Sequence, residues 1–281
     1  MAIGDSTRIN TNIAAFNALN ALKSINRNLE LSQLRLATGL RINQVSDDPA
    51  GFTISRRLEA RSRGLSVALD NVGTAKNVLS IAEGGLLNIS DILLTIKEKV
   101  TQAASDTFGT DERSAVKSEI SHLVAEIDNI ATETTFNGIN LVTGGYNAII
   151  QSGEGSGNTF SANLTAISVA SNVLNVEASD IANKVSSAVL ASAALIAVDA
   201  AIATINTGLQ TVGALSARLI TKESTLSIAI TNTEATRSRI IDADIAKEQL
   251  TATKFLILQQ TSTAQLAQAN ITPQNVLALF T

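Results

Sequence analysis

The clearest pattern in the sequence is an apolar residue at every seventh position over two long stretches. Such heptads are typical of long helices that pack along a shared seam. We therefore expect two long helices that pair antiparallel. In the first stretch the seam residues are Leu58, Leu65, Val72, Leu79, Leu86, Leu93 and Val100. In the second stretch they are Val198, Ile205, Val212, Leu219 and Leu226.

A simple antiparallel register can be drawn between these two heptads. It sets Leu86 opposite Val212, so that the sum of paired residue numbers is 298 throughout. The same register places Arg61 and Arg237 on the seam near one end. Buried guanidinium groups need acidic partners, and we expect such partners to be Glu59, Glu234 or Asp242.

A third, shorter helix and a β-rich region are predicted between the two heptads. The helix runs from Asp111 to Ala131, and Thr110 is its expected N-cap. Clusters of Gly, Asn and Ser follow, and around them Tyr146–Gln151 and Thr159–Val169 have the composition of short strands. We expect residues 137–180 to form a small β-rich tip that connects the outgoing long helix to the returning one.

Both ends of the chain predict a further helix that is rich in apolar residues. In the C-terminal helix these residues fall on several faces, and such a helix needs cover on all sides. A single chain of this shape cannot supply it, so we expect burial by other copies. The predicted domains are 1–45 with 240–281, and 46–239. The assembly residues are Ile9, Ile13, Phe16, Leu22, Leu29, Leu36, Ile245, Phe255, Leu256, Leu258, Leu266, Val276 and Leu277.

Composition narrows the possible functions. The 281 residues include no Cys and one His, and the formal net charge is −4. Disulfides, thiolate metal sites and mechanisms with two imidazoles are thereby excluded, and a general nucleic-acid binder is disfavoured. The start of the chain is polar, unlike a Sec signal peptide. No window approaches 18 uninterrupted apolar residues, so we expect no membrane span.

Candidate catalytic and binding motifs are weak. His122 lies on the predicted third helix without a visible Ser–Asp partner set. Gly153, Gly155 and Gly157 lack the Lys-Ser/Thr of a phosphate loop. We interpret Asp47-Asp48-Pro49 as a capping turn that starts the long helix, with Pro49 at the first helical position. We expect no enzyme, no cofactor and no metal.

A basic run on the first long helix allows two interpretations. It consists of Arg56, Arg57, Arg61 and Arg63. One interpretation is an anion or nucleic-acid patch, and the other is ion pairing with neighbouring helices or chains. Aromatic residues make up only 3% of this acidic chain, which favours ion pairing.

Motifs at both ends resemble a known family. The N-terminal part carries Ile9-Asn10-Thr11-Asn12, Leu36-Ala37-Thr38-Gly39-Leu40-Arg41-Ile42-Asn43 and Asp47-Asp48-Pro49-Ala50-Gly51, followed by Thr135-Phe136-Asn137-Gly138. The C-terminal part carries Ser238-Arg239-Ile240-Ile241-Asp242-Ala243-Asp244 and Pro273-Gln274-Asn275-Val276-Leu277. In this order the chain resembles a bacterial flagellin over essentially its whole length.

The resemblance implies a fold, a function and a set of partners. Flagellins polymerise into the extracellular helical filament that propels swimming bacteria, with the terminal helices in its inner wall. The implied partners are other copies, the export chaperone and type III export apparatus, and the cap and hook-junction proteins. The middle region is short, so large outer domains are not expected. Alternatives are a hook–filament junction protein or a secreted binding module recognised by host receptors.

The resemblance also points to a stretch that an animal Toll-like receptor senses in this family. It corresponds to the segment around Thr95 and Lys99, with Glu119 on the next helix. In strongly sensed members an Arg and a Leu stand at the positions of Thr95 and Lys99. These two differences argue against strong sensing, although Glu119 is retained.

Overall fold

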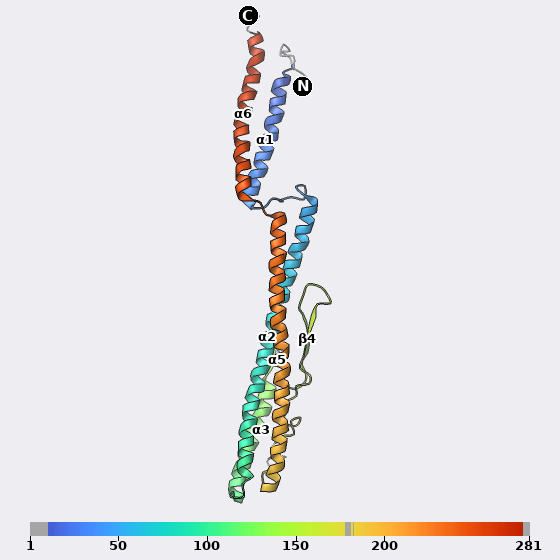
Figure 1. Ribbon diagram of the computed structural model, residues 1–281, viewed down its shortest axis with the longest axis vertical. Coiled ribbons are helices and arrows are strands. Elements are labelled where there is room, and N and C mark those ends of the chain that lie inside the picture. Colours follow the sequence, from blue (N-terminus) through green and yellow to red (C-terminus); the bar gives the residue numbers. More distant parts are fainter. Residues whose placement is uncertain (1–10, 178–180, 182, 278–281) are drawn as a thin grey trace. The chain divides into compact units, whose positions relative to one another are not determined.

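The computed structural model describes residues 11–177, 181 and 183–277. It is mainly helical with two small antiparallel sheets (Figure 1), as the sequence predicts. The helices are α1 (Ile13–Thr38), α2 (Pro49–Ala103), α3 (Thr110–Glu133), α5 (Ala188–Ile241) and α6 (Ile245–Leu277). The strands are β1 (Thr135–Phe136), β2 (Ile139–Asn140), β3 (Asn147–Gln151) and β4 (Thr159–Asn163).

The chain forms two compact units. One unit combines the described residues up to Ala60 with those from Asn232 onward, and the other is Arg61–Thr231. These divisions lie inside α2 and α5, further into the long helices than the predicted boundaries at 45/46 and 239/240. We call them the terminal unit and the bundle unit.

The heptad residues form the core of the bundle unit. Every predicted seam position from Leu65 to Val100 is buried on α2, and every one from Val198 to Leu226 is buried on α5. Leu58, which belongs to the terminal unit, is half-buried. Ala68, Ala75 and Ala82 are also buried, so small side chains alternate with Leu and Val along the seam.

Ion pairs between α2 and α5 agree with the predicted register. Lys76 Nζ lies 2.6 Å from Glu223 Oε2, where the register expects residue 222. Lys97 Nζ lies 2.7 Å from Asp199 Oδ1, where it expects residue 201. Both partners are therefore within two positions of the predicted ones.

The expectation of two arginines on the seam is wrong for Arg61. This side chain is exposed, and its Nε lies 2.9 Å from Glu154 Oε1 in the loop that joins β3 to β4. Arg237 is half-buried and donates from Nε to Glu234 Oε2 at 2.8 Å. That hydrogen bond raises the pKa of Arg237, and the nearby charges of Glu234, Asp242 and Glu59 act in the same direction.

Helix α3 begins one residue earlier than predicted. Gly109, not Thr110, is its N-cap, and no side chain caps it. Val116, Ile120 and Ile127 on this helix are buried in the core of the bundle unit. At the other end, a Cβ on Gly85 of α2 would lie only 2.5 Å from the Thr134 hydroxyl, so α3 ends close against α2.

The strands form two hairpins, and the first was not predicted. Asn137 and Gly138 take positive φ values of 50° and 76°, which suits a two-residue hairpin turn between β1 and β2. In the second hairpin β4 ends at Asn163 instead of Val169. The reason is local, because Asn163 Oδ1 accepts hydrogen bonds from the backbone N–H and the hydroxyl of Thr165, which turns the chain.

The second hairpin packs along the helices of the bundle unit. Asn71 on α2 donates from Nδ2 to the Gln151 carbonyl at 3.2 Å. The Arg218 guanidinium on α5 lies 4.9 Å from the centre of the buried Phe160 ring. The β-rich region therefore lies beside α2 and α5 rather than only beyond their ends, because α3 first carries the chain back along α2.

Among the described residues, two helices are long and apolar enough to cross a membrane by length and composition alone, namely α2 and residues 189–241 of α5. Their seam residues are buried inside the protein's own core. Core helices of this kind pass the same test, so their hydropathy has an explanation without a membrane.

Candidate self-assembly surface

The terminal unit is built on the antiparallel pairing of α1 with α6 (Figure 1). Asn12 donates from Nδ2 to the Ala269 carbonyl at 2.8 Å. Further along, Gln259 Nε2 donates to Asn26 Oδ1 at 2.9 Å. These two bonds join residues 257 and 233 positions apart, so they fix which part of α1 faces which part of α6.

In the described parts of these two helices, few side chains are buried. On α1 they are Leu29 and Ser32, and on α6 they are Ala252 and Ser262. Three of the four are small, which lets the helix axes approach closely. The contact is consequently narrow, and most apolar side chains of both helices remain outside it.

Large apolar side chains are exposed around the pair. Phe16 on α1 is 66% exposed and Leu250 on α6 is 74% exposed. Exposed apolar groups on this scale mark interaction sites, because monomeric proteins rarely leave them uncovered. We call this set the terminal apolar surface: Ile13, Phe16, Leu34, Ile245, Leu250, Leu256, Ile257, Leu258 and Ile271.

The predicted assembly residues differ in how far the structure exposes them to solvent. Leu29 is buried between the helices, while Leu22, Leu36, Phe255 and Leu266 are half-buried. Ile13, Phe16, Ile245, Leu256 and Leu258 belong to the terminal apolar surface. Ile9 lies outside the described residues, and so do the side chains of Val276 and Leu277.

The two connectors that join the terminal helices to the long helices are bonded to each other. Helix α1 ends at Gly39, whose φ of 71° is the left-handed conformation that favours glycine. The Gly39 carbonyl accepts from the Ala243 N–H at 2.8 Å, and the Arg41 N–H donates to the Ile241 carbonyl at 2.7 Å. This backbone pairing holds the C-terminal end of α1 next to the N-terminal end of α6.

Two aspartates set the start of α2. Asp47 Oδ2 accepts from the N–H groups of Gln44 and Asn43, and these two bonds lower the pKa of the Asp47 carboxyl below its usual range. Asp48 Oδ1 accepts from the Gly51 N–H at 3.0 Å, and Pro49 is the first helical residue. The capping turn predicted from the sequence is confirmed.

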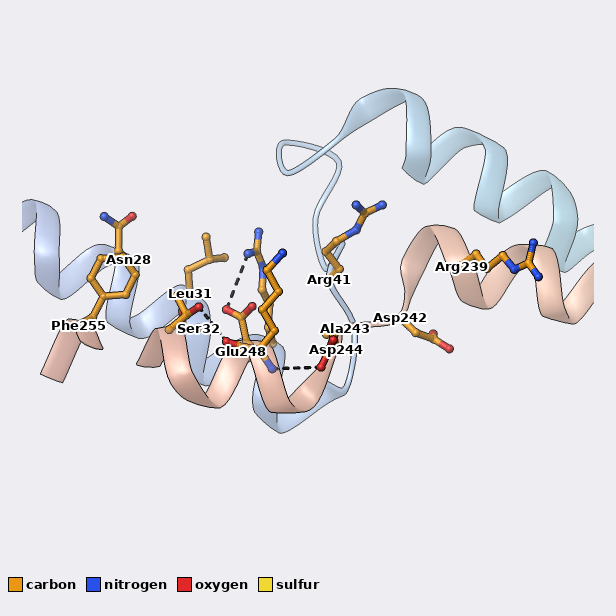
Figure 2. Close-up of a pocket in the computed structure, with 13 residues that line it drawn as sticks. Asn28, Leu31, Ser32, Arg41, Arg239, Asp242, Ala243, Asp244, Glu248 and Phe255 are labelled. Carbon is orange, nitrogen blue, oxygen red and sulfur yellow. Dashed lines mark hydrogen bonds and ion pairs between the residues drawn. The ribbon is translucent and has the colours of Figure 1, made fainter. Parts of the chain in front are cut away.

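A polar pocket of about 500 Å³ lies beside this junction (Figure 2). Arg35 Nη1 approaches Glu248 Oε1 at 3.9 Å across the two terminal helices. Asp244 Oδ1 accepts from the Lys247 N–H at 3.1 Å and so caps α6. The Arg35–Glu248 contact joins α1 to α6, and neither of these two contacts resembles a nucleophile with a base.

The remaining candidate motifs are dispersed. His122 is exposed on α3. Gly153 and Gly155 lie in the β3–β4 loop, where their carbonyls accept from Gln151 Nε2. Among the described residues, no group of three or more His, Cys, Asp or Glu side chains could hold a metal ion.

The stretch assigned to receptor contact lies on the bundle unit. Lys99 Nζ is 2.7 Å from Glu119 Oε1, so the Glu119 carboxylate is paired within its own chain. The Thr95 hydroxyl donates to the Asp91 carbonyl one turn earlier. Glu119 and Thr95 therefore already have polar partners within the bundle unit.

Sequence reasoning missed the polar contacts between α1 and α6. The spacing of apolar residues places Asn26 and Gln259 on the surface of their helices, so it does not predict the hydrogen bond between them. One signal was present, since Asn12 directly precedes the first helix and its Oδ1 accepts from the Ala15 N–H as an N-cap does. Its second bond, to Ala269, has no local signature.

Two protein families match the chain, one in its N-terminal part and one in its C-terminal part. The model of the bacterial flagellin N-terminal helical region matches residues 9–147, and that of the bacterial flagellin C-terminal helical region matches residues 195–280. Flagellin from Bacillus subtilis (strain 168) is 35% identical, and the alignment covers 97% of this chain and 99% of that relative. The flagellar filament 33 kDa core protein of Treponema phagedenis is 33% identical with the same coverage.

A solved structure supports the fold. The putative flagellar hook-associated protein from Vibrio parahaemolyticus matches with a TM-score of 0.60 at 16% identity, covering 70% of this chain and 100% of that one. At this identity the likeness concerns the fold alone. It does not bear on the choice between a filament subunit and a junction protein.

Proposed function

Because the chain belongs to the bacterial flagellin family, we propose that it polymerises by burying the terminal apolar surface of α1 and α6 against other copies. It is a structural subunit of the flagellar filament, and the filament lies outside the cell. The mechanism is the same hydrophobic burial that stabilises a protein core, applied between subunits.

The observation that carries this proposal is that the terminal unit leaves large apolar side chains exposed to solvent. Phe16 and Leu250 are mostly exposed in the described part of the chain, although α1 and α6 are paired with each other. Helix α6 carries apolar side chains around several faces, so a single partner helix leaves some of them in water. Several neighbouring copies, as in a helical polymer, can cover all of them.

Transport to the filament requires further partners. We propose export through the flagellar type III apparatus, with an export chaperone on the C-terminal helix and with cap and hook-junction proteins at the filament ends. The support is the family resemblance together with Leu250 and Ile257, whose exposure in a free subunit calls for temporary cover. Co-purification of the full chain with the chaperone, compared with a Leu250→Ser variant, tests this part.

Single substitutions in the full chain test the polymerisation mechanism. Phe16→Ser and Leu250→Ser should leave the thermal unfolding of the free subunit nearly unchanged, because both side chains are exposed in it. The same variants should sharply reduce polymer yield after seeding, measured by sedimentation. Phe16→Leu and Leu250→Ile are the matched controls, since they keep the apolar surface and should polymerise.

A further inference from the structure

One exposed face of α1 carries basic and apolar side chains together. Four exposed residues follow one another at spacings of four, three and four positions, which places them on the same side of the helix. They are Phe16, Asn20, Lys23 and Arg27. Leu29, which is buried, follows Arg27 by two positions and therefore lies on the opposite side of α1. The basic face is consequently not the face that packs against α6.

A pocket of about 450 Å³ lies on α1 at this basic face. Its lining residues are Asn20, Lys23, Asn26 and Arg27, so in the described part of the chain two cations and two side-chain amides line it, without a carboxylate. Asn26 Oδ1 already accepts from Gln259 Nε2 at 2.9 Å, so the group that Asn26 can offer to a ligand is its Nδ2 donor. Donors and positive charge in this combination fit a phosphate oxyanion.

The two cations of the pocket are not neutralised within the described part of the chain. Arg61 on α2 lies 2.9 Å from Glu154, whereas Lys23 and Arg27 form no ion pair with a described residue. Helix α1 contains a single acidic residue, Glu30, which follows Arg27 by three positions. Both charges are therefore available to a negatively charged partner from outside the chain.

Exposed apolar side chains flank the two cations along the helix. Ile13 and Phe16 come before them and are 47% and 66% exposed, and Leu34 comes after them and is 38% exposed. From Ile13 to Leu34 the helix extends over about 30 Å. A helix that combines Lys and Arg with exposed Phe and Leu is suited to lie in a membrane interface, where the cations meet lipid phosphates and the apolar groups meet acyl chains. A nucleic acid would satisfy the charges and leave these apolar side chains in water.

We propose that this face of α1 binds the surface of a membrane that contains anionic phospholipids, with a lipid phosphate group in the pocket at Lys23 and Arg27. The helix lies on the membrane and does not span it. The interaction goes beyond filament formation and belongs to the free subunit. Phe16 is also part of the terminal apolar surface, so under the proposed function it cannot contact lipid and another copy at once. Membrane-bound subunits are therefore held apart from the polymer until they are released.

Co-sedimentation of the full chain with lipid vesicles tests the proposal. Vesicles of phosphatidylglycerol and phosphatidylcholine in equal parts should bind the free subunit, and vesicles of uncharged phosphatidylcholine alone should bind it much less. Lys23→Gln combined with Arg27→Gln should lower the partition coefficient for the anionic vesicles by about thirtyfold, since each cation near such a surface contributes about fivefold. Phe16→Ser should also lower it, because an apolar contact with the acyl chains is removed.

Two variants are the matched controls. Arg27→Lys keeps the positive charge and should bind anionic vesicles nearly as well as the wild type. Lys222→Gln removes an exposed charge from α5 of the bundle unit and should leave the partition coefficient unchanged within about twofold. Because all of the substituted side chains are exposed, thermal unfolding of the free subunit should stay nearly the same in every variant.

Inorganic phosphate, compared with sodium chloride at equal ionic strength, distinguishes a lipid headgroup from a free anion. Binding of phosphate without binding of anionic vesicles would overturn the proposal. Equal binding to both kinds of vesicle, an equal loss in Lys222→Gln, or capture of an acidic protein in place of vesicles would overturn it as well. The assay uses free subunits, so a failure of the unaltered chain to polymerise would contradict the proposed function alone.

Discussion

The amide Nδ2 of Asn12 lies 2.8 Å from the carbonyl oxygen of Ala269, and this hydrogen bond joins α1 to α6 across 257 positions of sequence. The Oδ1 atom of the same side chain accepts from the Ala15 N–H and caps α1. One asparagine therefore both starts the N-terminal helix and holds it to the C-terminal one.

Removing this side chain should loosen the terminal unit. Asn12→Ala loses the cap and leaves the Ala269 carbonyl without its donor, and the expected cost is about 1–2 kcal/mol. Hydrogen exchange of α1 and α6 amides should speed up accordingly, with the bundle unit unaffected. Asn17→Ala, at an exposed position on the same helix, is the control. Equal exchange in both variants would show that the Asn12 contacts contribute nothing.

The seam predicts a sharp contrast between adjacent leucines. Leu86 is fully buried between helices, whereas Leu87 is about half exposed. Leu86→Ala should lower the free energy of unfolding by about 2–5 kcal/mol, because it removes buried methyl groups and leaves a cavity. Leu87→Ala should change it by less than about 0.5 kcal/mol. Denaturant titration of both variants checks this, and similar losses would contradict the assigned seam.

Acid should weaken the turn that starts α2. The Asp47 carboxylate is stabilised by two backbone N–H groups, so its pKa in the folded protein is lower than in the unfolded chain. A lowered pKa means that the contribution is present above the unfolded value of 3.8 and is lost as the pH falls through the folded value.

Asp47→Asn tests this dependence. The variant should be less stable than the wild type at neutral pH, and the difference should shrink below about pH 4. Thermal unfolding across that pH range measures it. Asp91→Asn, at an exposed carboxylate on α2, should show no comparable trend. A constant difference for Asp47→Asn at all pH values would refute the role of its charge.

The ion pair between Lys99 and Glu119 should limit sensing by the animal receptor. We propose that Lys99 occupies the carboxylate that the resemblance assigns to receptor contact. Replacing Thr95 by Arg and Lys99 by Leu together should free Glu119 and raise the response of receptor-expressing reporter cells. Adding Glu119→Ala to that double variant should abolish the gain. An unchanged response to the double variant would argue against this account.

Most of the helical architecture could be predicted from the sequence, because it depends on periodicity. Leu65, Leu79 and Leu93 fall seven apart, and a residue pattern of that kind allows few alternatives to a buried helix seam. Pro49 after two aspartates is an equally local signal. The predicted register also lies within one position of the Lys76–Glu223 ion pair that the structure shows.

What could not be predicted depends on contacts between distant segments. Arg61 has the right spacing for the seam, yet it faces Glu154 because the β3–β4 hairpin returns along α2. Nothing near Arg61 in sequence encodes that return. Similarly, Phe16 and Leu250 are exposed because the contact between α1 and α6 is narrow. The positions of apolar residues in the sequence do not show how wide that contact is.

Charge placed within the α1–α6 pair should affect assembly more than charge placed on the hairpin loop. Leu266 is half-buried on α6, while Ser156 is exposed between β3 and β4. Leu266→Asp should therefore weaken polymerisation far more than Ser156→Asp, because a carboxylate next to apolar side chains carries a desolvation cost. Sedimentation of seeded samples compares the two, and equal yields would refute the ranking.

The central claim is that the terminal helices form the filament contacts. Electron microscopy of the purified chain after seeding tests it most directly, with versions lacking residues 1–40 or 245–281 observed beside it. We expect filaments from the full chain, and folded monomers without filaments from both truncated versions. Filaments from either truncated version would contradict it.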